Sequence, residues 1–486
     1  KEIVLNKANL SSLLSFCRKA NELSAGVPNT FDGIEAELET PEQGWSPFGN
    51  SSFPQPKIGA ALSGDLYKLA EGSRTIELKF VARQNLSIST SNLLGKVSAF
   101  YTSEKGWEEF DKSTMLLSAS GKNVNVTLVA SVSQPAIVEF NSKIHERRIY
   151  EKTPTIELYF DNELAYRLKD VTLAQVETNV QVTGLKQLSL SNKLGNIDPS
   201  KTFMPFGPNP SEGEFVIMGS SELFSKNIFS ATLNIDWKIN ETYEDKSWAD
   251  TNVKLELLKD NEWKGTDGSF AKSVNFKTFL DTASFKFKKD SLIESSASQV
   301  YSVNSTSGFL KLTMQGPIGH ESYQEDYLRA SANIAKTPTD KSLVLPDKPY
   351  TPEIEAINVD YTSKTYTVAL GKTNNNVTNK LVFFHITPFG GNPAHGNDLN
   401  ASYPNLVWDS TNEGEFFIGF GDYRPGTSIH TLIQCIEGSS NPLKKAPDVS
   451  WFYLESNQWK SFEKSDLFDN TNGLIQSGIL TVGVPL

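Results

Sequence analysis

The chain has few of the residues that build covalent or metal-bound frameworks. Its 486 residues include 2 cysteines, Cys17 and Cys435, and 5 histidines. Cysteines so far apart in sequence do not form a disulfide framework, and no Cys-x-x-Cys pair predicts a zinc site. His385 and His395 flank one loop, where a structural role is the simpler interpretation. We therefore expect no metal and no cofactor.

Long apolar runs and an excess of positive charge are also lacking. No stretch reaches the roughly 18 apolar residues that a membrane-spanning helix needs, and Lys1–Leu5 lacks the apolar core of a secretory signal. The net charge of −11 argues against nucleic acid as a partner, because nucleic-acid-binding proteins concentrate Lys and Arg. The sequence thus predicts neither a membrane span nor nucleic-acid binding.

Motifs of nucleotide binding and of nucleophilic catalysis are absent from the sequence. There is no Gly-Lys-Ser/Thr phosphate loop and no dinucleotide glycine fingerprint. Ser220 and Ser221 follow Gly219, but without the elbow pattern of a serine hydrolase. We interpret these serines as structural.

Carboxylates are the more serious candidates for catalysis, because β-sandwich glycosidases use a pair of them. The clusters in question are Asp161 with Glu163, and Asp409 with Glu413 and Glu415. A chain with 57 acidic residues produces such clusters by chance, and solvated turn residues are the simpler interpretation. We therefore predict no catalytic residue, and that the chain is not an enzyme.

One pattern occurs three times in the chain. The tripeptide Pro-Phe-Gly stands at 47–49, 205–207 and 388–390. Each copy precedes an apolar run that ends in glycine, and each run is followed by a tryptophan. The runs end at Gly59, Gly219 and Gly419, and the tryptophans are Trp107, Trp263 and Trp459. The pattern indicates tandem copies of one domain type.

The chain length agrees with about three domains, since single cores stop growing well below this size. We predict a first domain at 1–150, a second at 151–340 and a third at 341–486. The proline-rich stretch 336–352 is the predicted boundary before the third domain. The charged stretch 141–154 is a weaker boundary before the second.

Most of the chain shows the alternation of polar and apolar residues that is typical of half-buried strands. Thr75–Phe80 and Thr232–Trp237 are the clearest cases, and Ile429–Ile436 predicts a strand covered on both faces. Helices are predicted at Asn9–Leu23 and Glu321–Ala335. The fold class is therefore mainly β, with three tandem β-sandwich-like domains and a few short helices, one of them near the N-terminus.

The aromatic residues of the repeated pattern have a packing interpretation. Phe206, between Pro and Gly, is predicted to enter the core, and the same holds for Phe48 and Phe389. The repeated tryptophans are predicted to cover a sheet edge or the end of a sandwich. Stacking on sugars is the alternative for these tryptophans, but a residue at one position in every copy is more easily explained by packing.

Several strings in the sequence resemble one family in their order and spacing. They are Gly64–Ile76, Phe203–Pro210, Gly213–Lys226, Lys348–Pro352, Glu437–Pro442, Trp451–Leu454, Asn457–Lys460 and Asp469–Ile479. They resemble the large baseplate-J-like proteins of contractile injection systems. These proteins are the baseplate wedge subunits of particles of the antifeeding-prophage and Photorhabdus-virulence-cassette type. The resemblance spans roughly residues 58 to 486.

The resemblance implies a structural role in a particle that is assembled in the bacterial cytoplasm and is then released or stays associated with the cell. It implies six-fold assembly and contacts with other wedge subunits, the hub and spike, the sheath and tail fibres. Family members continue beyond this point into the J-like region that joins neighbouring wedge subunits. The stretch that ends at Leu486 is therefore expected to lack that module.

The alternative function is a carbohydrate-binding or carbohydrate-active multi-domain β-sandwich protein, and a viral or cell-surface adhesin is a third option. This carbohydrate alternative would use the aromatic residues and the carboxylate clusters, whereas the ordered family strings favour the baseplate component. Cleavage of a glycan that is lost when one carboxylate is replaced would separate the two.

Overall fold

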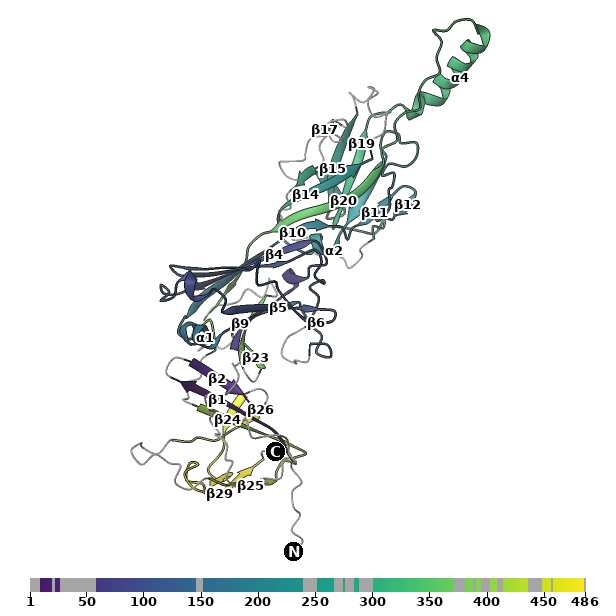
Figure 1. The fold of residues 1–486 in the computed structure, drawn as a ribbon. Helices are drawn as coiled ribbons and strands as arrows, with labels where there is room; N and C mark the ends of the chain where they lie inside the picture. Colours follow the sequence, from purple (N-terminus) through teal and green to yellow (C-terminus); the bar gives the residue numbers. More distant parts are fainter. Residues whose placement is uncertain are drawn as a thin grey trace. The chain divides into compact units, whose positions relative to one another are not determined.

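The computed structural model describes residues 9–19, 22–26, 58–145, 152–238, 251–265, 274–275, 284–287, 300–370, 381–387, 390–394, 403–408, 414–435, 448–455 and 458–484. Their fold is mainly β, as predicted (Figure 1). The chain divides into two compact units. The smaller unit comprises Lys1–Ile58, Asp161–Tyr166 and Asp409–Leu486, and the larger unit comprises Gly59–Phe160 and Arg167–Trp408.

An eight-stranded antiparallel sheet runs through the larger unit. Its strands are, in order, β18 (Ser284–Phe287), β14 (Ile228–Trp237), β20 (Ile354–Ser363), β10 (Leu173–Leu185), β4 (Ser73–Ala82), β8 (Asn123–Ala130) and β7 (Leu116–Ser120), with β21 (Tyr366–Ala369) beside β10. In β4, Ile76, Leu78 and Phe80 are buried while Glu77 between them is exposed. The alternation predicted for β4 and β14 is thus confirmed.

Two further sheets of the larger unit share one strand order. The six-stranded sheet consists of β23 (Gly390–Pro393), β22 (Val382–Thr387), β3 (Ile58–Ser63), β9 (Thr155–Phe160), β5 (Val97–Ser103) and β6 (Gly106–Glu109). The seven-stranded sheet consists of β12 (Gly195–Ile197), β11 (Ser189–Asn192), β13 (Phe215–Gly219), β19 (Phe309–Gln315), β15 (Asn252–Lys259) and β16 (Glu262–Gly265), with β17 (Val274–Asn275) beside β15. Each sheet begins with a hairpin and ends with the hairpin that carries Trp107 or Trp263.

The smaller unit holds shorter sheets. β1 (Asn9–Lys19) pairs with β2 (Glu22–Gly26) and with β24 (Gly414–Gly421). A second sheet has the order β25 (Ser428–Ile433), β29 (Gly478–Gly483) and β28 (Leu467–Asp469). The hairpin of β26 (Phe452–Glu455) and β27 (Gln458–Ser461) carries Trp459. Ile429, Leu480 and Val482 form the buried core beneath the second sheet.

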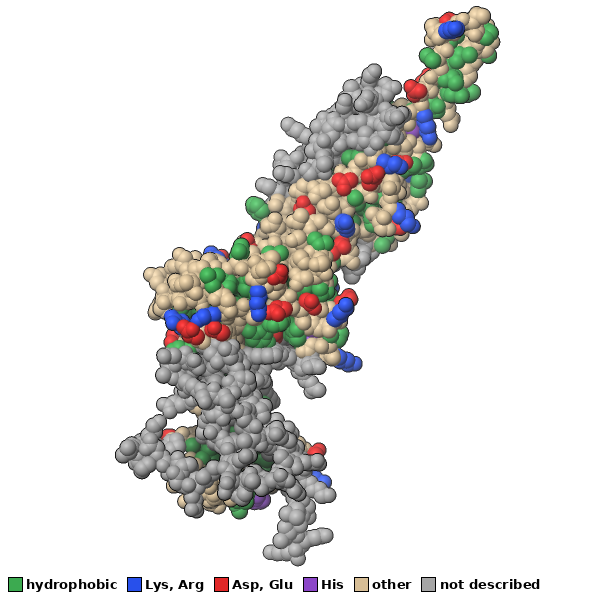
Figure 2. Space-filling model, in the orientation of Figure 1, with side chains coloured by type: hydrophobic (Ala, Val, Ile, Leu, Met, Phe, Trp, Pro, Cys, Tyr) green, Lys and Arg blue, Asp and Glu red, His purple; other side chains and the backbone are tan. Residues whose placement is uncertain are grey.

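The helical segments are short, apart from one. They are η1 (Asp65–Tyr67), η2 (Thr90–Asn92), α1 (Asn162–Leu168), α2 (Ser221–Phe224) and α4 (His320–Lys336). α4 confirms the helix predicted at Glu321–Ala335, and no residue of α4 is buried. Figure 2 shows hydrophobic side chains among polar ones on α4, and Leu328 there is exposed. None of the helices that the structure describes combines the length and the hydrophobicity that a membrane crossing requires.

The helix predicted at Asn9–Leu23 is wrong, because this stretch forms β1 and the start of β2. Leu13 lies opposite Ile418 and Leu14 opposite Phe417, in a ladder between residues about four hundred positions apart in sequence. A short apolar run does not distinguish helix from strand by its spacing. Ser, Phe and Cys in this run are also weak helix formers, so long-range pairing decides its structure.

The prediction that Ile429–Ile436 is covered on both faces is also wrong. Ile429 is buried, but His430 is exposed and Leu432 is 71% exposed. The described strand ends at Ile433. One face of β25 is therefore open, because β25, β29 and β28 have the buried core on their other face only.

The division at 150 and 340 stays a prediction. Strands from all three predicted domains, among them β4, β14 and β20, lie in one sheet. Of the repeated tripeptides, only Pro205-Phe206-Gly207 lies wholly within the described residues, and Phe206 is buried there. Phe48 and Phe389 lie outside the described residues.

The burial of Phe206 generates a stability prediction. Its side chain is 2% exposed, so Phe206→Ala removes a ring from a packed site and leaves a cavity. We expect the free energy of unfolding of the larger unit to fall by ~3–5 kcal/mol, measured by urea denaturation. Phe229→Ala, at an exposed position of β14, is the matched control and should cost less than ~1 kcal/mol. A loss below ~1 kcal/mol at Phe206 would assign this ring to an interface.

Candidate functional site

The larger unit contains a buried polar joint centred on Glu222. Ser220 caps α2 by accepting a hydrogen bond from the Leu223 N–H, and this fixes Glu222 in the first turn. One carboxylate oxygen accepts from the Ala70 N–H at 2.6 Å, and the other accepts from the Tyr361 hydroxyl at 2.5 Å. Glu222 thereby holds the loop after η1 and the strand β20 to the same short helix.

The same place contains the junction of β10 with β20. The ladder pairs Val182 with Tyr361, and a bulge follows at Gly184, whose φ of +82° suits glycine. At the bulge the Gly184 N–H donates to the Asp360 carboxylate at 2.7 Å instead of to a strand carbonyl. The Asp360 side chain thus satisfies a backbone N–H that the β10–β20 ladder leaves without a carbonyl partner.

The loop before β4 closes against this bulge. A side chain at Gly72 would place its Cβ 2.5 Å from the Thr183 carbonyl oxygen, and φ there is +80°. The neighbouring Glu71 carboxylate accepts from the Lys186 N–H at 2.6 Å. We call Glu71, Gly72, Gly184, Glu222, Lys226 and Tyr361 the joint.

Lys226 is the buried cation of the joint. Its Nζ donates to the Lys68 carbonyl at 2.8 Å and to the Glu222 carbonyl at 3.2 Å. Burial lowers the pKa of Lys226 from its ordinary 10.5 to about 8, and the negative charge of Glu222 opposes this effect. Burial also raises the pKa of Tyr361 well above its ordinary value, and the nearby Glu222 raises it further.

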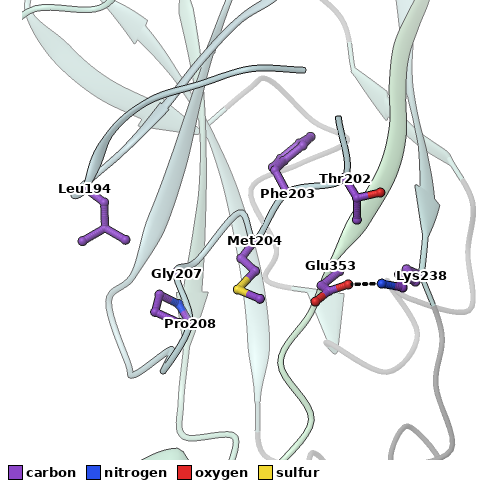
Figure 3. Close-up of a pocket in the computed structure, with 8 residues that line it drawn as sticks. All are labelled: Leu194, Thr202, Phe203, Met204, Gly207, Pro208, Lys238 and Glu353. Carbon is purple, nitrogen blue, oxygen red and sulfur yellow. Dashed lines mark hydrogen bonds and ion pairs between the residues drawn. The ribbon is translucent and has the colours of Figure 1, made fainter. Parts of the chain in front are cut away.

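A surface cavity of about 510 Å³ lies beside the second Pro-Phe-Gly. Its lining, drawn in Figure 3, is Leu194, Thr202, Phe203, Met204, Gly207, Pro208, Lys238 and Glu353. At one side Lys238 and Glu353 form an ion pair at 2.8 Å, and the Glu353 carboxylate raises the pKa of Lys238. Leu194 and Met204 add exposed apolar surface. Such a mixture of apolar side chains and one internally neutralised pair suits contact with another protein surface.

The family-like strings meet at these two places. Gly64–Ile76 supplies Ala70 and Glu71 to the joint, and Gly213–Lys226 supplies Glu222 and Lys226. Phe203–Pro210 lines the cavity, and Thr351 of the string Lys348–Pro352 donates to the Pro208 carbonyl beside it. Strings that are distant in sequence are thus brought together by the fold.

The histidines occupy structural positions. The His145 ring lies within hydrogen-bonding distance of the Ser103 carbonyl and stacks on Phe140. His320 begins α4, with its Nε2 3.0 Å from the Tyr350 carbonyl oxygen, and burial lowers its pKa. Burial likewise lowers the pKa of His385, whose Nε2 lies 2.7 Å from the Asn405 carbonyl oxygen. His395 lies outside the described residues, among which no group of His, Cys, Asp and Glu is arranged to hold a metal.

The candidate carboxylates do not form a described pair. Asp161 accepts a hydrogen bond from the Leu164 N–H at 2.7 Å at the start of α1, and Glu163 is exposed. Glu415 lies in β24, while Asp409 and Glu413 lie outside the described residues. On the face in Figure 2, acidic and basic side chains are interspersed over the larger unit.

The repeated tryptophans occupy one register position in three hairpins. Trp107 lies opposite Thr102, Trp263 opposite Leu258 and Trp459 opposite Leu454. β6 and β16 are edge strands, as predicted for a sheet-edge role. Trp107 contacts Phe140 and His145, and Trp263 contacts Tyr301, so rings of the same chain occupy their faces. Trp459 contacts Phe417 of β24, but it differs from the other two because it is 53% exposed.

The sequence did not predict the joint. Glu222 stands between serines and the apolar pair Leu223-Phe224, and no local pattern shows that its carboxylate is buried. The one available signal is a charged residue beside a short apolar run within a family-like string. Its partners Ala70 and Tyr361 are remote in sequence, so only the fold identifies them.

The lowered pKa of Lys226 predicts a pH dependence of stability. Between pH of about 8 and 10.5, Lys226 is protonated in the unfolded chain and largely neutral in the folded chain. Because the unfolded chain binds more protons there, the contribution of Lys226 to the free energy of unfolding increases as the pH rises through that window. Compared with Lys226→Met, the wild-type free energy of unfolding should rise by about 2 kcal/mol between pH values of about 7.5 and 10 in urea titrations. Lys193→Met, at a half-exposed position, is the control and should leave the slope unchanged. Parallel profiles for the wild type and Lys226→Met would contradict the burial of this charge.

The whole chain was compared with known proteins. The family model described as Baseplate protein PVC11-like matches residues 1–485. Comparison with the curated proteins gave no match. The family match assigns the chain to the baseplate of a contractile injection particle of the PVC type, as its sequence strings predicted.

Proposed function

The chain belongs to the PVC11-like family of baseplate proteins, and from this premise we propose that it is a wedge or arm component that transmits the trigger for sheath contraction. The observation that carries the proposal is the family match over residues 1–485. The proposed role is structural and not enzymatic. It is consistent with the positions of the histidines and the described carboxylates, which serve as caps and hydrogen-bonding partners of the backbone.

We propose that the arm arose by duplication. In chain order, β3 to β10 contain a strand, a short helical turn, a strand, a Trp hairpin, further strands, a helix and a final strand, and β13 to β20 repeat this order. β4 lies between β8 and β10, as β14 lies between β18 and β20. β24 to β29 repeat part of this order, namely a strand, a second strand, a Trp hairpin and two further strands, and β25, β29 and β28 pair as β4, β8 and β7 do.

The lever mechanism follows from the joint. A trigger that acts at one surface is transmitted to another surface only if the protein between them resists bending. The contacts between such rigid bodies then switch between two arrangements. Within the larger unit, the hydrogen bond from the Ala70 N–H to Glu222, the bond from Lys226 Nζ to the Lys68 carbonyl and the β10–β20 ladder join the first proposed copy to the second. The larger unit is therefore suited to act as one rigid element.

The proposed partners are other wedge subunits, the hub and spike, the sheath and tail fibres, in a six-fold assembly. The proposed place of assembly is the bacterial cytoplasm, before the particle is released. The cavity beside Lys238 and Glu353 and the exposed helix α4 are surfaces that such contacts can use.

The structural role is tested by removing the chain from a particle-producing strain. We expect sheath and tube proteins to be made but complete baseplates to be absent in electron micrographs, and a plasmid copy of the chain to restore them. A plasmid copy that carries the exposed substitution Phe229→Ala should restore them equally. Normal, contraction-competent particles without the chain would exclude this role.

The transmission role is tested at the joint. Glu222→Gln keeps one acceptor oxygen for the Ala70 N–H, but it replaces the other by an NH2 group, so the Tyr361 hydroxyl can no longer donate at this position. The substitution also removes the buried negative charge that acts on Lys226. We expect particles with this variant to assemble, and the fraction that contracts on target cells to fall severalfold in micrographs. Glu139→Gln, which changes an exposed ion pair with Lys68, should contract normally. Unchanged contraction in Glu222→Gln particles would show that the joint does not transmit the trigger.

A further inference from the structure

The helix α4 (His320–Lys336) has a half-buried side and an open side. Tyr323 and Ile334 lie about three turns apart on the half-buried side. Leu328 lies on the open side and is 69% exposed. Ala332, one turn after Leu328 on the same side, is also exposed. The open side of α4 therefore combines one large apolar side chain with a small neighbour.

The described contacts of α4 with its own chain hold its first turn. The Glu321 carboxylate accepts from the Glu212 N–H at 3.0 Å, and the His320 Nε2 lies 3.0 Å from the Tyr350 carbonyl oxygen. The 17 residues of α4 include Ser, Asn, His and Ile, which are only moderate helix formers. Packing supplies most of the stability of such a helix, and no residue of α4 is buried. The open side is thus suited to a further contact.

Opposite charges are separated along the open side of α4. Glu325 precedes Leu328, whereas Arg329 and Lys336 follow it, and all three charged residues are exposed. The helix dipole accounts for charges in the first and last turns only, and Glu325 and Arg329 lie nearer the middle. Among the residues that the structure describes, neither Glu325 nor Arg329 has an ion-pair partner. The pattern of charge is therefore available to a partner outside this chain.

An antiparallel second copy of α4 matches this pattern. If the pair is centred between Leu328 and Arg329, Glu325 lies opposite Ala332 of the second copy, within one turn of the Arg329 and Lys336 of that copy. Leu328 then lies within one turn of the second copy's Ala332, whose small side chain leaves room for it. Two-fold symmetry forms each of these contacts twice. A parallel pair would instead place like charges side by side, which is unfavourable.

We propose that α4 binds α4 of a second copy of this chain, with the two helices antiparallel and in contact through Glu325, Leu328 and Ala332. This interaction surface goes beyond the structural role proposed above and does not depend on it. Leu328 supplies the apolar area that the contact buries, and the opposite charges set the orientation of the helices. The contact is of the size of weak interfaces, so in an assembly it adds to other contacts between the copies.

Thiol crosslinking of the isolated full chain tests the pairing. Leu328→Cys places one thiol at the centre of the proposed contact, and Val132→Cys, at a 74% exposed position elsewhere in the larger unit, is the matched control. With a short bismaleimide at equal protein concentration, we expect at least about fivefold more covalent dimer from Leu328→Cys, because pairing raises the effective concentration of its thiol. The unsubstituted chain, which contains Cys17 and Cys435, gives the background. Equal yields from the two variants would overturn the proposal.

Charge exchange within the Leu328→Cys chain tests the orientation and the identity of the partner. Glu325→Lys puts like charges together in the pair and should lower the dimer yield at least about threefold. Adding Arg329→Glu and Lys336→Glu should restore the yield, since position 325 again meets opposite charges on the second copy. Asp326→Lys makes the same change on the other side of α4 and should alter the yield less than about twofold. Circular dichroism checks the fold of each variant.

Two results of the charge exchange would overturn the proposal. The first is an equal loss of dimer from Glu325→Lys and Asp326→Lys, which would indicate a general effect of charge. The second is no recovery of the yield when Arg329→Glu and Lys336→Glu are added, which would exclude a self-complementary contact.

The assembled particle shows whether the contact persists there. Particles that carry Leu328→Cys should give a covalent dimer of this chain after bismaleimide treatment, identified by mass spectrometry. Capture of a different baseplate subunit in its place would overturn the proposal, because that subunit would then cover the open side of α4. The structural role has its own test in the strain that lacks the chain, so the two ideas fail separately.

Discussion

The hydrogen bonds of one buried carboxylate hold together the elements on which the larger unit depends. A short ladder, interrupted by the Gly184 bulge, joins β10 to β20, together with hydrogen bonds from the Gly184 N–H to Asp360 and from the Val180 N–H to Ser363. Glu222 supplements this ladder by accepting from the Ala70 N–H and from the Tyr361 hydroxyl. A buried carboxylate that lost one of these donors would retain its desolvation cost without the compensating bond, so the joint favours a single arrangement. The eight-stranded sheet runs across the joint from β4 and β10 to β20 and β14.

The sequence predicted the elements better than their connections. Alternation identified β4 and β14 because one face of each strand is buried and the other is open to solvent. The spacing of apolar residues at Asn9–Leu23 wrongly predicted a helix, because pairing with β24 overrides a weak helical pattern. The prediction of a strand covered on both faces at Ile429–Ile436 was also wrong, because an apolar run does not show whether both faces are covered. The joint was missed because burial of Glu222 depends on partners more than a hundred residues away.

The same reasoning separates packing from function among the repeated aromatic residues. Trp107 and Trp263 lie at sheet edges against rings of their own chain, which explains them without a ligand. Trp459 shares their register but is half exposed. We therefore expect functional surface where the proposed copies differ, at the half-exposed Trp459 and at α4, and we expect the shared positions to maintain the fold. In a baseplate protein, such differences are natural places for contacts with other subunits.

The central claim is that the two proposed copies in the larger unit, β3 to β10 and β13 to β20, behave as one rigid body. Native-state hydrogen exchange of the isolated chain tests it most directly, because exchange reports the opening free energy of each segment. The account predicts that the amides in the middle of β4, β10, β14 and β20 share one opening free energy, equal to that of global unfolding of the larger unit. An opening of β14 and β20 at a free energy several kcal/mol below that of β4 and β10 would contradict the account, since the joint would then be a hinge.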